Sequence, residues 1–547
     1  MSCTPARSGG SLWLRLGRRV WLAGLMLVGL VLVGLLLVAG LAGCAALPPA
    51  AHREDSHAIA ADAATPLGAV AAQAAAHPGL SGVRALPQAA FALDARFELI
   101  RRAQVSLDVQ YYLIGRDDVG RALLRELQAA AVRGVRVRFL IDDAYTVDMD
   151  ALLLGLAAQP GVEVRLFNPF TDGRESVAGR ALNAIGDFRR LNHRMHNKLL
   201  LADGAFAVIG GRNMADEYFQ RHEDANFLDF DLLVLGPVLP DLARLFDSYW
   251  NHPHVMPVQA VARSELDDRQ LRDDFLREVH SAPVRPWPAT PDQDLYGDPP
   301  LGADLDRGLP RLIWAAARAY ADTPDKVSFE RRPEQFDSTV THRTIESLRE
   351  ARSEIVLVSP YFIPGSAGVA RLQEARQRGV TVRVVTNSMA ASDEPLVSMA
   401  YHRYRLPLLR AGVQLYELSP AQLRIDPRAR ASFGRSKGSL HAKLAFIDRR
   451  IVLLGSMNLD ARSAWTNTEL GLRIDSAELS DRIGGVPALA TGRGAYQVRL
   501  AEDGATLRWH ALNSGADESP LADEPEVGWF ERLKLKFLSL FVAEDLL

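Results

Sequence analysis

Two stretches of this chain share one pattern: HNKLLLAD at residues 196–203 and HAKLAFID at residues 441–448. Each reads His, one residue, Lys, four residues and Asp, and the second His lies 245 residues after the first. A glycine turn and an asparagine follow in both places, as GGRN at residues 210–213 and GSMN at residues 455–458. The residues between these fixed positions differ. The repetition predicts that one structural unit occurs twice in the chain.

The sequence in front of each motif also repeats. RGVRVRFL at residues 133–140 matches RGVTVRVV at residues 378–385, and Gly134 and Gly379 each precede the motif histidine by 62 residues. Apolar periodicity predicts alternating helices and strands, which favours an α/β fold of two lobes with mainly parallel sheets. The expected helices span residues 94–104, 120–134, 342–353 and 368–379, and the expected strands span residues 105–114, 135–143, 354–363 and 380–387.

The composition is that of a globular protein with two folded units. The chain has 547 residues, of which 48% are hydrophobic and 24% charged, and this length is enough for two cores. Its net charge of -3 lacks the basic excess of most nucleic-acid-binding proteins, so we expect no nucleic-acid partner. Both cysteines, Cys3 and Cys44, precede the expected folded region. That region therefore contains no disulfide framework and no cysteine-rich metal site.

The first 44 residues have the features of an export signal. Arg15, Arg18 and Arg19 precede an apolar run at residues 20–42, and the segment ends in LAGC. The form Leu-Ala-Gly-Cys resembles the lipobox of bacterial lipoproteins, which implies cleavage before Cys44 and lipid attachment to that cysteine. The alternative is an uncleaved transmembrane anchor, because about 20 apolar residues can span a bilayer. Both interpretations place the globular part at a membrane, on the periplasmic side of a bacterial cell envelope.

Composition also divides the chain into segments. Alanines and prolines predict a flexible tether after the signal, and a proline-rich stretch predicts an irregular insertion between the lobes. A hairpin with Asp503-Gly504 as its turn is expected near the end, and the last helix would lie in a membrane interface or on the core. The expected segments are a signal peptide at 1–43, a tether at 44–85, a first lobe at 86–325 with the insertion at about 255–325, a second lobe at 326–480, and the hairpin and amphipathic helix at 481–547.

The fixed residues of the motif suit chemistry at a phosphate. In a strand, His196 and Lys198 would point to the same side. An imidazole can attack or transfer protons near neutral pH, and an ammonium beside it can hold an anionic oxygen. A glycine allows close backbone approach, and an asparagine amide can donate to a phosphate oxygen. One such motif would be weak evidence, whereas two complete copies in two similar units indicate a functional site.

These residues resemble the signature of the phospholipase D superfamily, and the resemblance covers residues 86–475. It implies that the two motifs meet at a pseudo-twofold interface and form one active site, without a metal ion or organic cofactor. One His attacks phosphorus and forms a phosphohistidine, while the other protonates the leaving alcohol and then acts as base for the incoming one. We assign the attack to His196 as a hypothesis. In-line displacement requires a nucleophile and an acid on opposite sides of phosphorus, which such a pair provides.

The resemblance also implies roles for further residues. A carboxylate orients each His; Glu469 matches the family position after the second motif, and Asp229 is the best match after the first, with Asp231 as its competitor. The motif carboxylates Asp203 and Asp448 belong to the expected catalytic set, although a structural role is favoured because both lie beyond the strand. The first motif has Gly211 where the family often has Ser, which leaves only a backbone amide for phosphate. The expected catalytic residues are His196, Lys198, Asp203, Asp229, His441, Lys443, Asp448 and Glu469, and the expected phosphate contacts are Gly211, Asn213, Ser456 and Asn458.

Within the superfamily the chain is most similar to the bacterial cardiolipin synthases, including the type called cardiolipin synthase C. RMHNK, GGRNMADEYF, FDSYWN, SLHAK and GSMNLDARSAWTNTELG carry this resemblance. It implies transfer of a phosphatidyl group from phosphatidylethanolamine or phosphatidylglycerol to phosphatidylglycerol, on a membrane and without a protein partner to complete the site. The alternatives are a hydrolytic phospholipase D, a nuclease, which the charge disfavours, and an inactive membrane-binding scaffold, which two intact motifs disfavour.

Two further groups could have functions of their own. The HPH sequence at His252–His254 could bind a metal but has no matching Cys or Asp set, so we interpret these residues as surface histidines. His193 is expected in the wall of the site. Asp142 and Asp143 end an expected strand, where α/β sheets often present functional residues, but they could equally form a turn.

Overall fold

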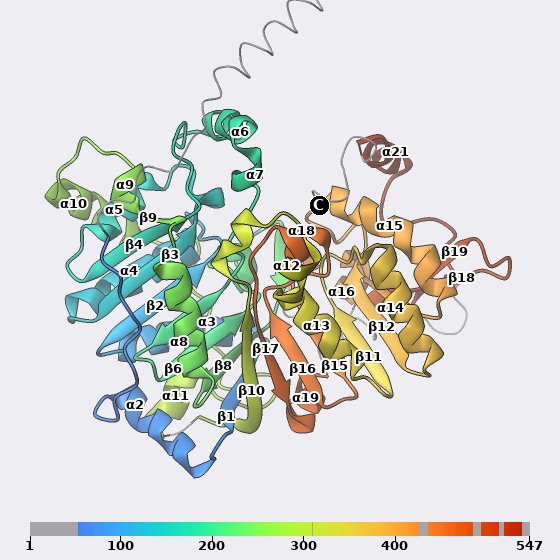
Figure 1. The fold of residues 1–547 in the computed structure, drawn as a ribbon, viewed down its shortest axis with the longest axis horizontal. Coiled ribbons are helices and arrows are strands. Elements are labelled where there is room, and N and C mark those ends of the chain that lie inside the picture. Colours follow the sequence, from blue (N-terminus) through green and yellow to red (C-terminus); the bar gives the residue numbers. More distant parts are fainter. Residues whose placement is uncertain (1–52, 309, 426–435, 485–493, 513–518, 539–547) are drawn as a thin grey trace, which may run out of the picture.

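The structure is a computed structural model that describes residues 53–308, 310–425, 436–484, 494–512 and 519–538. Two similar halves lie side by side, each a twisted sheet with helices packed on it (Figure 1). The predicted signal peptide, the lipid-anchor residue Cys44 and the first part of the tether lie outside the described residues.

The sheet of the first half has the order β9-β4-β3-β2-β5-β6-β8-β1. Its strands β2, β3 and β4 are parallel, and the remaining neighbours are antiparallel. The strands are β1 (Ser81–Leu86), β2 (Ser106–Tyr111), β3 (Arg136–Asp142), β4 (Val162–Phe167), β5 (Leu199–Ala202), β6 (Phe206–Gly210), β8 (Asp231–Leu235) and β9 (Val255–Pro257).

The second half repeats this order as β18-β13-β12-β11-β15-β16-β17-β10, with β19 added at the β18 edge. Here too the three strands β11, β12 and β13 are parallel. The strands are β10 (Ile313–Ala321), β11 (Glu354–Val358), β12 (Thr381–Asn387), β13 (Gln414–Leu418), β15 (Leu444–Ile447), β16 (Ile451–Gly455), β17 (Leu470–Asp475), β18 (Ala495–Leu500) and β19 (Leu507–Ala511).

The two sheets join into one. Strand β1 pairs antiparallel with β10, from Ser81 opposite Ala315 to Val83 opposite Ile313, so a single 17-stranded sheet crosses the molecule. A second, two-stranded sheet also links the halves, because β7 (Ala225–Leu228) pairs in parallel with β14 (Lys437–Leu440). These links place the corresponding elements of the two halves around a pseudo-twofold axis.

The predicted α/β fold with a duplicated domain is confirmed, but the sheets are mixed rather than mainly parallel. Each motif runs into a tight hairpin, β5–β6 or β15–β16, and a short connection can join only antiparallel neighbours. The proline-rich segment is also more ordered than predicted. It contains β9, α10 and β10, and β10 lies in the predicted first lobe although it pairs with β17 of the second half. The expected hairpin near the C-terminus is formed by β18 and β19.

Helices cover the sheets and connect their parallel strands. Helix α3 precedes β2 and α4 follows it, and α13 and α14 take the same places around β11. In the first half these are α2 (Pro66–Ala71), α3 (Ala89–Arg102), α4 (Asp118–Val132), α5 (Asp150–Ala157), α6 (Val177–Gly186), α7 (Phe188–Leu191), α8 (Leu239–Trp250), α9 (Val258–Val261), α10 (Asp268–Val279) and α11 (Leu301–Asp306). In the second half they are α12 (Pro333–Asp337), α13 (Val340–Arg349), α14 (Gly365–Gln377), α15 (Pro395–Arg410), α16 (Pro420–Ile425), α18 (Ala461–Trp465), α19 (Ala477–Ile483) and α21 (Trp529–Leu538).

The hydrophobic core continues from one half into the other. One buried cluster contains Ile209 and Phe246 of the first half together with Val358 and Leu454 of the second. Two further clusters fill the outer layers, one in each half. Because the residues of the shared cluster are as deeply buried as those of the other two, we infer that the halves form one rigid body around their interface.

The motif aspartates Asp203 and Asp448 hold this framework together and lie away from the motif imidazoles. The Asp203 carboxylate accepts hydrogen bonds from the backbone amides of residues 104–106, at the start of β2. Asp448 accepts the corresponding three amides of residues 352–354 at the start of β11. Both aspartates have a positive φ, 51° and 52°. Their expected place in the catalytic set is therefore corrected: each ties the motif hairpin to the neighbouring strand, which the position beyond the strand had favoured.

We predict that Asp203→Ala and Asp448→Ala each lower the free energy of unfolding by about 1–3 kcal/mol, because several backbone amides lose their acceptor. Although burial opposes it, bonding to these amides lowers the pKa of Asp448 to about 2. Its contribution should therefore be complete above the unfolded carboxyl pKa of about 4 and be lost as the pH falls towards 2. Urea unfolding at several pH values measures this. A large loss of kcat with unchanged stability would contradict the structural role.

Candidate active site

Each motif histidine is bound by the backbone of the opposite half. The amide of His196 donates to the carbonyl of Thr468 at 2.9 Å, and the amide of His441 donates to the carbonyl of Leu228 at 2.7 Å. Thr468 and Leu228 stand directly before Glu469 and Asp229. Strands β5 and β15 begin directly after Lys198 and Lys443, so each motif histidine and lysine lies just before the strand in which the sequence had placed it. The two motifs therefore meet at the interface.

The imidazole rings continue this exchange between the halves. Nδ1 of His196 lies 2.9 Å from a Glu469 oxygen, and Nδ1 of His441 lies 2.6 Å from an Asp229 oxygen. Each ring is thus oriented by a carboxylate that follows the other motif in the sequence. The competitor Asp231 instead pairs with Arg96 and Arg212 at 3.0 and 2.9 Å. Asp229 is therefore the residue that the structure brings to His441.

The two carboxylates are supported in different ways. Glu469 accepts hydrogen bonds from the hydroxyls of Ser456 and Ser463. Beside Asp229 stands Gly211, where an added Cβ would lie only 2.1 Å from the Asp229 carboxylate. The shorter aspartate thus occupies the space that a serine side chain would need. The amide of Gly211 donates to the carbonyl of Phe230. Gly211 and Ser456 are therefore reassigned from phosphate contact to shaping the carboxylates.

The lysines lie beside the histidines and are fully enclosed. Nζ of Lys198 donates to the carbonyl of His196 at 2.7 Å, and Nζ of Lys443 donates to the carbonyl of His441 at 2.6 Å. Burial lowers the pKa of Lys443 to about 8 and lowers that of Lys198 well below its ordinary value. The ammonium of Lys443 further lowers the pKa of Lys198, and that of Lys198 lowers the pKa of His196. Glu469 and Asp229 oppose the shift in both lysines, but each of these carboxylates is also bound to a histidine, and burial still disfavours the two ammonium groups. A phosphate between them would remove that cost.

Both imidazoles are neutral at physiological pH. Burial lowers the pKa of His196 to about 4, although Glu469 opposes the shift, and burial with Lys443 lowers the pKa of His441. A neutral ring whose Nδ1–H donates to a carboxylate has its lone pair on Nε2. In His196, Nε2 makes no hydrogen bond with the described residues, whereas in His441 it lies 3.1 Å from Nζ of Lys443. The same Nζ is also 3.1 Å from Nδ1 of His441, so the two histidines differ in whether a lysine lies against the ring.

The two asparagines after the motifs differ. The side-chain amide of Asn213 donates to the Tyr218 hydroxyl, and its oxygen accepts from the amide of Leu113. Asn458 is buried, and its side-chain amide makes no hydrogen bond within the described residues. Asn458 therefore has the bonding capacity that a phosphate contact requires, while Asn213 would have to exchange a partner.

Aromatic rings that the motifs did not identify surround the histidines. Tyr112 packs edge-on against His196 and Tyr218 against His441, both at 5.0 Å between ring centres, and Phe227 lies 4.9 Å from His441. Tyr145 continues from Tyr112 to the surface, where it is exposed. These rings keep water from the imidazoles. The Tyr-Tyr pair at the end of the predicted strand could have indicated one of them.

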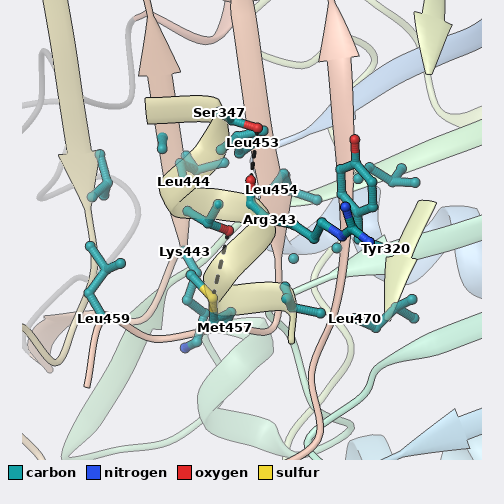
Figure 2. A pocket seen from close by; sticks show the side chains of 17 residues that line it. Tyr320, Arg343, Ser347, Lys443, Leu444, Leu453, Leu454, Met457, Leu459 and Leu470 are labelled. Carbon is teal, nitrogen blue, oxygen red and sulfur yellow. Dashed lines mark hydrogen bonds between the residues drawn. The ribbon is translucent and has the colours of Figure 1, made fainter. Parts of the chain in front are cut away.

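A small cavity of about 50 Å³ lies behind Lys443. Figure 2 shows Ser347 and Arg343 of α13 above Met457, with Arg343 reaching towards Tyr320 on one side and Lys443 on the other. The hydroxyl of Thr344 contacts the sulfur of Met457. Helix α13 is therefore not closely packed against Lys443 and the strands β15 and β16 that follow it.

The other candidate groups are structural. Nε2 of His252 lies 3.0 Å from the exposed Asp325, and Nδ1 of His193 lies 2.6 Å from the carbonyl of Arg189. Asp142 accepts the amide of Met195, the residue before His196, and so positions the first motif. Asp143 forms an ion pair with Arg174. Within the described part of the chain, no cluster of three or more His, Cys, Asp or Glu side chains could hold a metal ion.

Sequence comparison identifies the family. The profile of the family described as "Cardiolipin synthase, PLD-like domain" matches residues 97–250 and 344–484, the segments that contain the two motifs. The chain belongs to this family. Each matched segment includes the His and Lys of one motif and the carboxylate that binds the histidine of the other half.

Named relatives and a solved structure agree with this assignment. Cardiolipin synthase C of Escherichia coli (strain K12) is 36% identical over 489 residues, which are 86% of this chain and 97% of that protein. Cardiolipin synthase A of Pseudomonas syringae pv. syringae (strain B728a) is 26% identical over 76% of this chain and 70% of that protein. The crystal structure of phosphatidylserine synthase from Haemophilus influenzae Rd KW20 shares the fold, with a TM-score of 0.52 and 13% identity over 86% of this chain and 97% of that one.

We predict that Glu469→Gln disturbs His196 and that Asp229→Asn disturbs His441, because each carboxylate orients the ring of the opposite half. Ring ¹⁵N shifts in NMR spectra report the tautomer of each histidine, and each substitution should change only its crossed partner. Turnover should fall by about 10²-fold or more, the contribution of a well-placed acid–base pair.

Asp203→Asn is the matched control, because this carboxylate contacts no imidazole. It should leave both rings unchanged. A tautomer change of His441 in Glu469→Gln would overturn the crossed pairing.

Proposed function

We propose that the protein is a phosphatidyltransferase that makes cardiolipin. Nε2 of His196 attacks the phosphorus of a donor phospholipid, phosphatidylethanolamine or phosphatidylglycerol. A P–N bond forms while the P–O bond to the head-group alcohol breaks, and His441, which takes up a proton at Nε2 when the anionic phosphate binds, gives that proton to the departing oxygen. The neutral His441 then removes the proton from a glycerol hydroxyl of phosphatidylglycerol, whose oxygen displaces His196 from phosphorus.

The observation that carries this proposal is the crossed pairing of His196 with Glu469 and of His441 with Asp229. It brings both histidines to the interface, where Lys443 of the second motif is close enough to lower the pKa of His196, and each carboxylate stabilises the imidazolium of its partner. The negative charge of a bound phosphate would raise the low pKa of His441 and let it carry the proton that the leaving oxygen needs. Lys198 and Lys443 would hold the phosphate oxygens.

Transfer to an alcohol is favoured over hydrolysis. The relatives with 36% and 26% identity are named for cardiolipin synthesis, and the aromatic rings around the histidines limit access of water. Hydrolysis would use the same residues, with water in place of the glycerol hydroxyl. Only the identity of the acceptor separates the two reactions.

The test is to incubate the purified full chain with phosphatidylglycerol, with and without phosphatidylethanolamine, and to resolve the lipid products. We expect cardiolipin, and the effect of phosphatidylethanolamine identifies the donor. Phosphatidic acid without cardiolipin would show a hydrolase instead. His196→Ala and His441→Ala should each reduce turnover by at least about 10⁴-fold at unchanged melting temperature, because each removes one role from a shared pair. In the unaltered protein, rapid alkaline quenching should trap a ³²P-labelled phosphatidyl group on His196, and His196→Ala should carry no such label.

We propose that the chain acts at the surface of a phospholipid membrane. The described residues contain no helix long and apolar enough to span one. Attachment through the amino-terminal segment is expected from the sequence, and exposed apolar side chains on the described helices would add to it. Val177 and Leu182 of α6 and Trp529 and Phe530 of α21 are exposed. Figure 1 shows α6 and α21 projecting from the same edge of the molecule. Aromatic and aliphatic side chains with nearby lysines, such as Lys534, suit the headgroup region.

Membrane attachment predicts two effects. Cys44→Ala should leave a longer precursor without lipid, measured by mass spectrometry of the full chain; unchanged processing would contradict the lipoprotein interpretation. Trp529→Ser with Phe530→Ser should reduce turnover on vesicles by about a hundredfold and leave turnover on detergent-dispersed lipid unchanged, because burial of such side chains contributes at least about 1.5 kcal/mol each. Val132→Ser with Val284→Ser, which are exposed on other elements, is the matched control.

A further inference from the structure

The second half contains an apolar cavity of about 610 Å³ whose floor is β11 and whose walls are α13 and α14. Ile355 and Leu357 of β11 form the floor, and Phe362 and Trp465 close one end. This volume lies within the range of about 300–1,000 Å³ that is typical of ligand pockets. Apolar lining predominates over polar lining. The natural occupant is therefore a hydrocarbon group.

The corresponding helices of the first half are packed more closely. There α3 packs directly on α4 over β2, and nine residues of α3 and ten of α4 are buried. In the second half only Val340 and Ser347 of α13 and Leu372 and Ala375 of α14 are buried. Since the two halves otherwise repeat strand by strand, the opening is a specific departure from the duplication. The space is open to solvent, and an exposed apolar surface of this kind is typical of a ligand-binding groove.

The cavity reaches the segment that directly follows the second motif. Leu459 and Asp460, which follow Asn458, line it. Asp460 accepts the amide of Ser463, whose hydroxyl donates to Glu469, the carboxylate that orients His196. A phospholipid whose phosphate lies between the histidines could therefore place one chain in the cavity without leaving the site.

Basic side chains stand around the apolar interior. Arg331, Arg349, Arg371 and Arg378 are among the lining residues, and Arg371 and Arg378 form no ion pair with the described residues. Guanidinium groups bind phosphate and carbonyl oxygens well. Asp337, Glu374 and Asp460 line the cavity as well, so its charged rim is mixed and only its apolar interior is complementary to a lipid chain.

We propose that this cavity binds one acyl chain of a phospholipid substrate. The inference rests on the proposed function, since it places a substrate chain beside the site of phosphatidyl transfer. It assigns to α13 and α14 a role in selecting chain length. The first half, where α3 and α4 are closed, makes no such contact, so the two phospholipids of the reaction are bound differently.

The direct test is photolabelling of the full chain with phosphatidylglycerol that carries a diazirine on one acyl chain. We expect the label on β11, α13 or α14, both in the active protein and in His196→Ala. A label confined to other elements would overturn the proposal. Because this readout does not require turnover, failure of the cavity and failure of the proposed function are distinguishable.

Kinetics give a second test. Ile345→Trp and Ala367→Phe place a larger side chain at the cavity, and we expect kcat/KM to fall by about tenfold or more with hexadecanoyl lipids, since even one misplaced methylene can cost that much. Hexanoyl lipids in micelles should be used as well as by the unaltered protein, which also shows that the variants fold. Ala370→Phe on α14 is the matched control, because Ala370 is exposed and does not line the cavity. An equal loss with both lipids, or no loss, would overturn the proposal.

Discussion

The structure depends on the exchange of two carboxylates across the interface between the halves. Glu469 holds the ring of His196 and Asp229 holds that of His441, and the backbone amide of each histidine is bound one residue earlier on the same opposite segment. Neither half contains a complete site. A buried imidazole with a buried carboxylate needs fixed geometry, since an unpaired charge there would be costly. The continuous sheet through β1 and β10 and the shared apolar core supply that rigidity.

The same enclosure accounts for the electrostatics. Two lysines and two carboxylates share a small buried space, and burial lowers the pKa of both lysines and both histidines. Proteins place groups with displaced pKa values where chemistry occurs. The arrangement is most favourable when an anion with two or more oxygens lies between the ammonium groups. A phosphate diester meets this condition and also presents the atom that an imidazole can attack.

Duplication did not make the halves equal. At the serine position of the second motif, Ser456 supports the longer Glu469, while Gly211 leaves space for the shorter Asp229. Nε2 of His441 lies beside Lys443, whereas Nε2 of His196 makes no such contact. In the first half α3 packs closely against α4, whereas in the second half α13 and α14 border an open apolar cavity. A reaction that distinguishes donor from acceptor requires differences of this kind.

Much of this protein could be derived from residue types and their spacing. Two copies of His-x-Lys-x₄-Asp in two similar helix–strand series identified the duplicated α/β fold and both histidines, because covalent spacing and apolar periodicity are local properties. The mixed sheets and the support of Ser456 for Glu469 were not derivable, since they depend on pairing between distant segments. Which carboxylate holds which ring was undecided for the same reason: 273 and 212 residues separate the partners. The sequence by itself determined which groups carry the chemistry; only the tertiary structure decided that each half completes the other and that the second half is open, because both follow from how packed elements fill space.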